Sequence, residues 1–190
     1  MFATKRCVAC VAQADVRKYY DSLPMLRLLY WLLHKGADKT RVMACMRHQL
    51  MTQIKVRLPL ANKCSVIRNR IVGGLTGSRV AGSLARIPIE EMLVTFADSW
   101  IAKGFAKQVT VASWIDNLLA FSSSIGGAIG MLEECENHLE RPWNLQFKQG
   151  STEFLVVWGS MDDELVSERW RKVDVFNSLG HRIEHTGSIQ

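Results

Sequence analysis

Two aspartates stand where a predicted apolar strand meets a turn, which is a costly place for a carboxylate. Asp15 ends the apolar run over residues 8–16, and Asp116 lies between two apolar runs over residues 109–115 and 118–121. Burial beside apolar side chains is expensive for a carboxylate unless it meets a cation or a hydrogen-bond donor. Taken alone, Asp15 could simply cap the turn that follows its strand. Taken together, the two aspartates favour a cation site.

The two carboxylates could share the same metal ions if their strands pair side by side. Polymerases need this arrangement, because carboxylates hold a pair of Mg²⁺ ions about 3.5–4 Å apart that stabilise the attacking and leaving oxygens. Hard oxygen ligands suit Mg²⁺, which keeps waters and substrate phosphates in its shell. The two aspartates therefore favour a site for a pair of divalent cations, Mg²⁺ or Mn²⁺.

The elements that must position these residues alternate between strands and helices. Apolar spacing predicts helices over residues 24–34, 40–53, 79–102 and 127–140, the last with acidic residues on its exposed face. Further strands are predicted over residues 54–58, 64–72 and 154–158, with a small hairpin over 175–185 around Gly180. Asp116 and Asn117 should form the tight turn, because Asn tolerates a positive φ. Hairpins among helices indicate an α+β fold, with an antiparallel or mixed sheet packed against helices.

Charge is distributed unevenly along the chain. The net charge is +6, but residues 1–110 carry 18 Lys/Arg against 6 Asp/Glu, whereas residues 111–190 carry 6 against 12. Between Lys35 and Arg86 there are 11 basic residues and one acid, Asp38. A solvated face explains scattered lysines, but so one-sided a stretch favours a polyanion, such as nucleic acid, as the partner.

Composition excludes several other classes of protein. Hydrophobic residues make up 48% and charged residues 22% of the chain, which is typical of a globular domain. No apolar run approaches the roughly 18 residues needed to cross a membrane, and we find no targeting signal. Five scattered cysteines argue against a disulfide framework and favour a reducing intracellular compartment, the cytoplasm or nucleus. Cys7 and Cys10 have C-x-x-C spacing without a second ligand pair, so two buried thiols are expected there.

Several segments resemble the palm motifs of reverse transcriptases. Residues 15–24 resemble motif A, in which an Asp is followed five residues later by an aromatic residue. Residues 114–121 resemble motif C, an aromatic-x-Asp-Asp sequence followed by apolar residues. Residues 73–84 resemble motif B, usually G-x-x-Q-G-S-x-x-S-P-x-L.

The resemblance continues to the end of the chain. Residues 145–154 are similar to motif D, and residues 176–183 with 186–189 resemble the final palm hairpin of retroelement and group II intron-type enzymes. Order and spacing agree over roughly residues 8–190. The resemblance implies a single palm domain over residues 1–190, without the N-terminal part of the fingers and without the thumb. It also implies an RNA-directed DNA polymerase, which joins a dNTP to a primer 3′-hydroxyl on an RNA or DNA template.

The resemblance also implies roles for individual residues. Asp15 and Asp116 correspond to the metal ligands, with the Val16 carbonyl as a third, and Asn117 completes the catalytic set. Tyr20 falls at the steric-gate position, which disfavours a ribose 2′-hydroxyl, although a core aromatic is the alternative. The other implied contacts are with substrate, through Thr76, Gly77, Ser78 and Lys148, and with nucleic-acid phosphates, through Arg68, Arg70 and Arg79. Lys148 resembles the motif D lysine that assists the leaving pyrophosphate, although Ser151 lies in the nearer register.

Three departures from the family pattern leave alternatives open. Asn117 replaces the second Asp of motif C, Thr76 replaces the motif B Gln, and residues 81–82 read Ala-Gly in place of Ser-Pro. One alternative is a catalytically decayed reverse-transcriptase remnant that only binds nucleic acid. A structural interaction module and an RNA-directed RNA polymerase are the others; Tyr20 and the Leu179-Gly180 hairpin favour the reverse-transcriptase side.

Overall fold

The computed structural model describes residues 9–51, 54–58, 63–67, 72–102, 109–158, 166–178 and 181–184. The chain divides into two compact units. We call residues 1–17 with 88–190 the sheet unit, and residues 18–87 the helical unit. Arg68 and Arg70, two of the predicted phosphate contacts, lie outside the described residues, as does Cys7.

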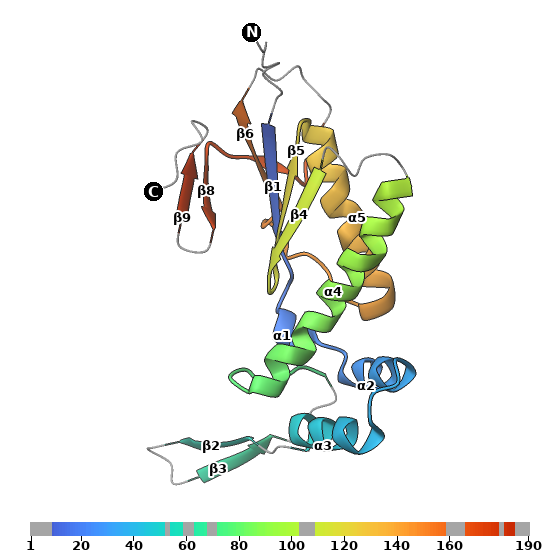
Figure 1. The fold of residues 1–190 in the computed structure, drawn as a ribbon. Helices are drawn as coiled ribbons and strands as arrows, with labels where there is room; N and C mark the ends of the chain where they lie inside the picture. Colours follow the sequence, from blue (N-terminus) through green and yellow to red (C-terminus); the bar gives the residue numbers. More distant parts are fainter. Residues whose placement is uncertain are drawn as a thin grey trace. The chain divides into compact units, whose positions relative to one another are not determined.

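The sheet unit is built on five strands in the order β4-β5-β1-β6-β7 (Figure 1). The strands are β1 (Ala9–Asp15), β4 (Val109–Trp114), β5 (Asn117–Ser122), β6 (Glu153–Trp158) and β7 (Arg171–Lys172). All neighbours pair antiparallel except β6 and β7, which pair parallel. The predicted α+β fold with a mixed sheet packed against helices is therefore confirmed.

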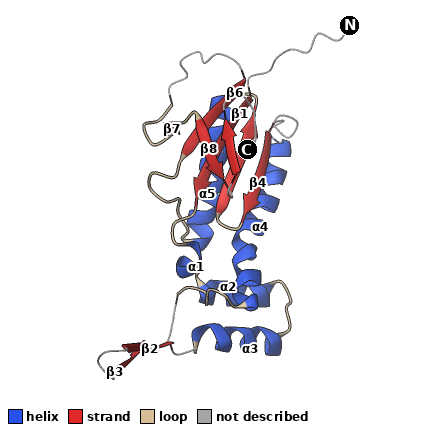
Figure 2. Ribbon diagram, turned by 90° about the vertical axis from the view of Figure 1, so that its left-hand side faces the viewer, coloured by secondary structure: helices blue, strands red, loops and turns tan. Residues whose placement is uncertain are grey.

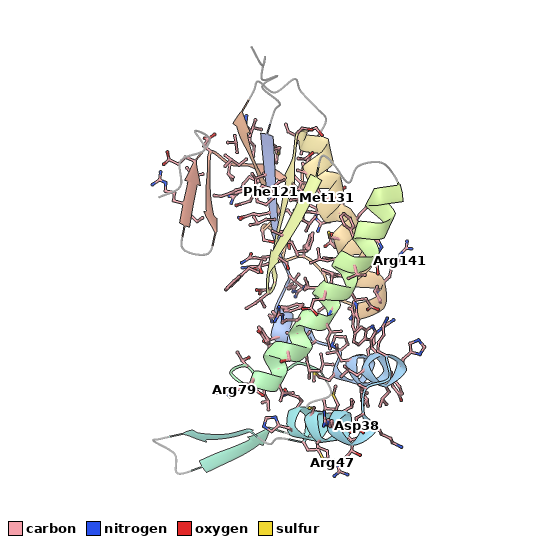
Figure 3. The ribbon with its side chains drawn as sticks, in the orientation of Figure 1. Asp38, Arg47, Arg79, Phe121, Met131 and Arg141 are labelled. Carbon is pink, nitrogen blue, oxygen red and sulfur yellow. The ribbon has the colours of Figure 1, made fainter. Side chains whose placement is uncertain are left out.

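One face of the sheet is covered by helix α5 (Ile125–Trp143), which contacts β1 and β5 (Figures 1 and 2). Successive side chains of a strand point to opposite faces. Cys10, Ala12 and Ala14 of β1 share the covered face and are almost fully buried. Because these side chains are small, the helix can approach the strand closely. Figure 3 shows Met131 on α5, which is buried in this layer.

The other face of β1 carries Val11, Gln13 and Asp15 by the same alternation. Val11 packs there with Leu155 and Phe176 in a small apolar cluster. Phe176 belongs to the hairpin of β8 (Val175–Ser178) and β9 (His181–Glu184), as predicted; residues 179–180 are outside the described part. The hairpin covers the apolar end of this face, so Asp15 lies at its other end.

Helix α4 (Arg79–Ala102) has the bounds that the sequence predicts. From Pro88 onward it belongs to the sheet unit, where Phe96 meets His138 of α5 edge to face, with ring centroids 6.4 Å apart. Among the described residues, no helix is long and apolar enough to cross a membrane.

The helical unit contains α1 (Tyr19–Ser22), α2 (Met25–His34), α3 (Lys39–Leu50), the β2–β3 hairpin (Ile54–Leu58 with Lys63–Ile67) and the start of α4. Helix α2 follows Pro24 and ends before Gly36, which has a φ of 81°. The Asp38 side chain caps α3 by accepting a hydrogen bond of 2.9 Å from the Arg41 N–H. These caps explain why the predicted starts of the two helices agree with the structure.

One predicted helix end in the helical unit is wrong. Helix α3 ends at Leu50, with Met51 as its C-cap, and does not reach residue 53. Apolar spacing continues past the helix because the following strand begins with Ile54, so periodicity alone could not separate the two elements. Strand β3 is described from Lys63 to Ile67, and residues 68–71 of the strand predicted over 64–72 lie outside the described residues.

Candidate active site

A two-residue turn joins β4 to β5 and carries Asp116. Trp114 pairs with Asn117 across the hairpin, so Ile115 and Asp116 form the turn. The predicted turn of Asp116 and Asn117 is therefore wrong by one residue, because Asn117 already pairs with both neighbouring strands. The positive φ falls on Ile115, at 58°, and not on the Asn. This conformation is strained for a β-branched residue, and such strain tends to occur at functional sites.

Strand pairing brings Asp15 and Asp116 together, as the sequence predicts. Asp15 pairs with Asn117 at the end of the β1–β5 ladder, and the Val16 N–H donates to the Asp116 carbonyl at 3.0 Å. Burial raises the pKa of Asp15, and the nearby Asp116 carboxyl raises it further through its charge and through a hydrogen bond. Two carboxyls placed this close repel when both are ionised, which is the electrostatic condition that a cation relieves.

Lys148 and Ser151 both contact Asp15. The Lys148 N–H donates to the Asp15 carbonyl at 2.7 Å, and the Ser151 hydroxyl accepts a hydrogen bond of 3.1 Å from the Asp15 N–H. The Lys148 ammonium lies 4.0 Å from Oδ2 of Asp15, and its charge opposes the rise in the pKa of that carboxyl. Both motif D candidates therefore contact the backbone of Asp15, and Lys148 also places its charge beside the Asp15 carboxylate.

The donor set suits a hard divalent cation. Asp15 and Asp116 supply carboxylate oxygens, and the Asn117 side chain shares the sheet face of Asp15, its cross-strand partner. The Val16 N–H points toward Asp116. Because the N–H and C=O of an extended residue face the same edge, the Val16 carbonyl should face that side too. No group of three or more His, Cys, Asp and Glu suited to a metal occurs in the described part of the chain. Further ligands would thus be amide, backbone or water oxygens.

Glu136 of α5 holds the loop that carries Lys148, a role that the sequence did not suggest. Its Oε1 accepts a hydrogen bond of 2.9 Å from the Phe147 N–H. Its carboxylate also pairs with Arg169 through both oxygens, at 2.6 and 2.7 Å. The acids of α5 were expected on a solvated face, but Glu133 and Glu140 also accept side-chain hydrogen bonds, from Trp170 and Gln146. Their spacing on one side of the helix was the available signal.

A cavity of about 690 Å³ lies beside this loop rather than at the aspartates. Its lining includes Glu136, Glu140, Phe147, Glu168 and Arg169, and contains neither Asp15 nor Asp116. Three of these residues are acids, so the cavity is poorly suited to a phosphate-bearing substrate. The two aspartates that the sequence predicts as metal ligands therefore lie outside this cavity, at the end of β1 and β5.

The helical unit holds the other predicted substrate residues. Tyr20 is half-buried, meets Tyr19 edge to face at 6.0 Å, and accepts a hydrogen bond of 2.7 Å from the Gly74 N–H through its carbonyl. Thr76, Gly77 and Arg79 are exposed, with Gly77 at a φ of 87°, whereas Ser78 is half-buried. Figure 3 shows Arg79 at the start of α4. All of these residues belong to the helical unit, and their roles stay predictions.

Gln49 holds the segment that carries Thr76, Gly77 and Ser78, and the sequence analysis did not identify it. It is fully buried, its Oε1 accepts from the Leu75 N–H at 2.8 Å, and its amide donates to the Ser78 hydroxyl at 3.2 Å. Buried polar groups need such partners. Gln49 follows Val42 and Met46 on the buried side of α3, so a polar residue at an apolar position was the signal.

Close approach of the backbone explains the first glycine of the motif B segment. The Gly73 N–H donates to the Leu23 carbonyl at 2.9 Å, and Gly73 has a φ of 90°. A Cβ at this position would lie 2.9 Å from the Asp21 carbonyl oxygen. A larger residue would therefore be strained and would clash with the end of α1.

Comparison with known proteins bears on the fold. No family model and no curated protein matches the chain. Among solved structures, telomerase from Candida tropicalis in complex with a fragment of telomeric RNA gives a TM-score of 0.70 at 12% identity, covering 99% of this chain. Apo telomerase from the same yeast, truncated from its C-terminal domain, gives 0.67 at 10% identity over 96% of this chain. Telomerase from Candida albicans gives 0.67 at 10% identity over 96%.

These matches show that the chain has a reverse-transcriptase-like fold. The identities are too low to show more than the fold. They do not single out the group II intron type over other reverse transcriptases. The chain spans about a third of the telomerase chains it matches. It covers 35% of the truncated apo protein, and 30% each of the Candida tropicalis and Candida albicans telomerases in complex with a fragment of telomeric RNA.

Proposed function

We propose that this chain is the palm portion of an RNA-directed DNA polymerase and that Asp15 and Asp116 hold its metal ions. The observation that supports this most strongly is the placement of the two carboxyls at the shared end of β1 and β5, with Asn117 beside them. The likeness to telomerase supports the fold but not the chemistry. On the motif resemblance, we assign the polymerase to a retroelement or intron-type lineage.

The residues of the proposed site have distinct tasks. Asp15 and Asp116, with the Val16 carbonyl and the Asn117 amide oxygen, would bind Mg²⁺ or Mn²⁺. Such an ion supplies positive charge that stabilises the transferring phosphoryl group and aligns it with the primer 3′-hydroxyl. Lys148 would place a further positive charge next to Asp15, where a departing pyrophosphate gathers negative charge.

The incoming dNTP would be bound by Tyr20, Thr76, Gly77 and Ser78. The phosphate backbone of the template and primer would be bound by Arg68, Arg70 and Arg79. Gly77 has no side chain to keep a substrate away from the backbone. Tyr20 would exclude a ribose 2′-hydroxyl, so Tyr20→Ala should relax the discrimination against ribonucleotides. These roles follow from the motif resemblance.

The test is primer extension by the purified chain on an RNA template with dNTPs and either Mg²⁺ or Mn²⁺. Extension that falls at least a hundredfold in Asp116→Ala, and that persists in Asp174→Asn, is the expected result. Asp174 is a suitable control because it is an exposed acid of the same unit. Extension that survives Asp116→Ala would show that the metal site is assigned to the wrong residues.

A nucleic-acid-binding remnant without catalysis is the second candidate. It is favoured by Asn117, which removes one negative charge from the site, and by Lys148, whose ammonium already faces Asp15. This candidate predicts RNA binding that is indifferent to Mg²⁺ and to Asn117→Asp, with no extension. The polymerase predicts binding that depends on Mg²⁺ and is preserved in Asn117→Asp.

A further inference from the structure

We propose that the ion pair between Glu136 and Arg169 positions the Phe147–Lys148 loop and thereby holds the Lys148 ammonium beside Asp15. The inference rests on the function proposed above, because it assigns a task to residues outside the metal site. Glu136 and Arg169 are positioning residues in this account, since they act on the site only through Lys148.

Glu136 is hydrogen-bonded to Phe147, the residue directly before Lys148 in the chain. Oε1 of Glu136 accepts hydrogen bonds from the Phe147 N–H at 2.9 Å and from the Arg169 guanidinium at 2.7 Å. Its other oxygen lies 2.6 Å from Arg169. A charged, bidentate pair is stronger and more directional than a neutral hydrogen bond. Glu136 therefore joins the loop to α5 at a fixed point.

Arg169 holds the same loop from its other side. Its guanidinium lies over the Phe147 ring, 5.9 Å from the centroid, and its carbonyl accepts a hydrogen bond of 2.6 Å from the Thr152 hydroxyl. The loop is thus tied at Phe147 and again at Thr152, on both sides of Lys148. Only 13% of the Glu136 side chain is exposed, so solvent screens this pair less than a surface pair.

The Lys148 side chain, unlike its backbone, is held only weakly. Its side chain is 63% exposed, and the ammonium meets Asp15 at 4.0 Å, which is a weak contact for an ion pair in water. Its N–H, in contrast, donates to the Asp15 carbonyl at 2.7 Å. The position of the ammonium consequently depends on where the backbone of residues 147–148 lies. Hydrogen bonds to Asp15 and Arg17 hold one side of that backbone segment, and Glu136 and Arg169 hold the other.

Amide hydrogen exchange on the metal-free chain tests the positioning directly. Glu136→Ala should lower the protection of the Lys148 amide about tenfold, because the loop loses a charged hydrogen bond. Glu136→Gln should restore part of that protection, because an amide oxygen can still accept from the Phe147 N–H. Glu140→Ala is the matched control, since it removes an acid one turn further along α5 whose partner is Gln146. Unchanged protection in a folded Glu136→Ala protein would overturn the proposal.

Manganese affinity, measured by electron paramagnetic resonance, tests whether the effect reaches the site through Lys148. Lys148→Met should tighten Mn²⁺ binding about fivefold, because a positive charge near Asp15 is removed. Glu136→Ala should also tighten Mn²⁺ binding, about twofold, because the Lys148 ammonium is then held less closely beside Asp15. Loss of a negative charge at residue 136 would by itself weaken the binding. In the Lys148→Met background, Glu136→Ala should have no such effect. Tightening that persists there would contradict the proposal.

The two measurements separate this inference from the proposed function. If the chain binds no Mn²⁺ through Asp15 and Asp116 while Glu136→Ala still lowers the protection of Lys148, the function is wrong and the positioning stands. Arg169→Lys provides a second variant that keeps the charge but loses the two-oxygen pairing. It should lower the protection of the Lys148 amide less than Glu136→Ala does, and an intact protection there would count against the role of Arg169.

Discussion

Asp15 occupies an environment that disfavours its charge when no metal is present. Its carboxyl is about one-third exposed and lies next to Asp116, with Lys148 as a nearby opposing charge. Burial is the largest cause of its raised pKa, and the neighbouring carboxyl follows. Two neighbouring carboxylates that repel each other favour the binding of a divalent cation, because the ion offsets the repulsion.

Asp116→Asn should lower the pKa of Asp15 in the metal-free chain, because it removes a neighbouring negative charge. A carbon NMR titration of the Asp15 carboxyl measures this shift, with Asp174→Asn as the control. The folded chain holds the Asp15 proton above its ordinary pKa of 3.8, so stability falls as the pH rises from there through the raised pKa. The variant should lose less stability over this window. An unchanged pKa would mean that the two carboxyls do not interact.

At the residue scale the sequence predicted the aspartates but not what surrounds them. Asp15, Asp116 and Lys148 were found from their motifs, and strand pairing brings them together. Glu136 was not found, because its partner Arg169 is 33 residues away and nothing local links them. The predicted turn included Asn117 because Asn tolerates a positive φ. In the structure, Asn117 pairs with strands on both sides and so belongs to β5.

Helix α5 covers one face of the sheet, and two of its three glycines, Gly127 and Gly130, differ in surroundings. A Cβ on Gly127 would lie 2.5 Å from the Ser122 hydroxyl oxygen and 2.7 Å from that of Ser124. A Cβ on Gly130 would meet nothing within 4 Å. The first glycine is therefore required by close contact at the start of the helix, and the second is not.

Gly127→Ala should destabilise the chain by about 1–3 kcal/mol, because it crowds the contact between α5 and β5. Gly130→Ala should stabilise it by up to about 1 kcal/mol, because alanine favours the helix more than glycine does. Urea unfolding of the two variants measures both effects. Equal effects of the same sign would show that the helix packs differently on the sheet.

Cys135 of α5 gives a pH-dependent test of the same layer. Burial raises the pKa of this thiol from 9.0 to about 12. The folded chain keeps the proton while the unfolded chain loses it, so stability falls as the pH rises from 9.0 toward 12. The loss should be on the order of 1 kcal/mol per pH unit, and Cys135→Ala should reduce it. Unfolding measured between pH 8 and pH 10.5 checks this, and an equal slope in the variant would contradict it.

Helix and strand bounds were predicted well where a start or stop signal lies inside the segment itself. Helix α4 was predicted with both ends right, and α2 began as expected after Pro24. The end of α3 was missed because an apolar strand follows after a few residues. The two aspartates pointed to the pairing of β1 with β5, but the sequence did not indicate that β1 also pairs with β6, which follows it by more than 100 residues.

The two units of the molecule carry opposite charge. The helical unit has 13 Lys/Arg against 2 Asp/Glu, whereas the sheet unit has 11 against 16. Arg41 and Arg47 of α3 are exposed, and Figure 3 shows Arg47 on that helix. A polyanion should therefore bind the helical unit, while the acidic sheet unit supplies the carboxylates.

Binding of single-stranded RNA to the full chain should weaken steeply with salt. Arg41→Gln and Arg47→Gln should each lower the affinity severalfold and reduce the slope of log K against log salt by about 0.7. Lys172→Gln, an exposed basic residue of the sheet unit, is the matched control. Fluorescence anisotropy at several salt concentrations measures the slopes. Equal losses in all three variants would place the binding surface elsewhere.

Iron-mediated cleavage tests the central claim, that Asp15 and Asp116 form one divalent-metal site, most directly. Fe²⁺ bound in place of Mg²⁺ cuts the backbone next to its ligands when ascorbate and peroxide are added. We expect cuts near Asp15 and near Asp116, suppressed by excess Mg²⁺ and lost in Asp116→Ala. Cuts that avoid both segments, or that persist unchanged in Asp116→Ala, would contradict it.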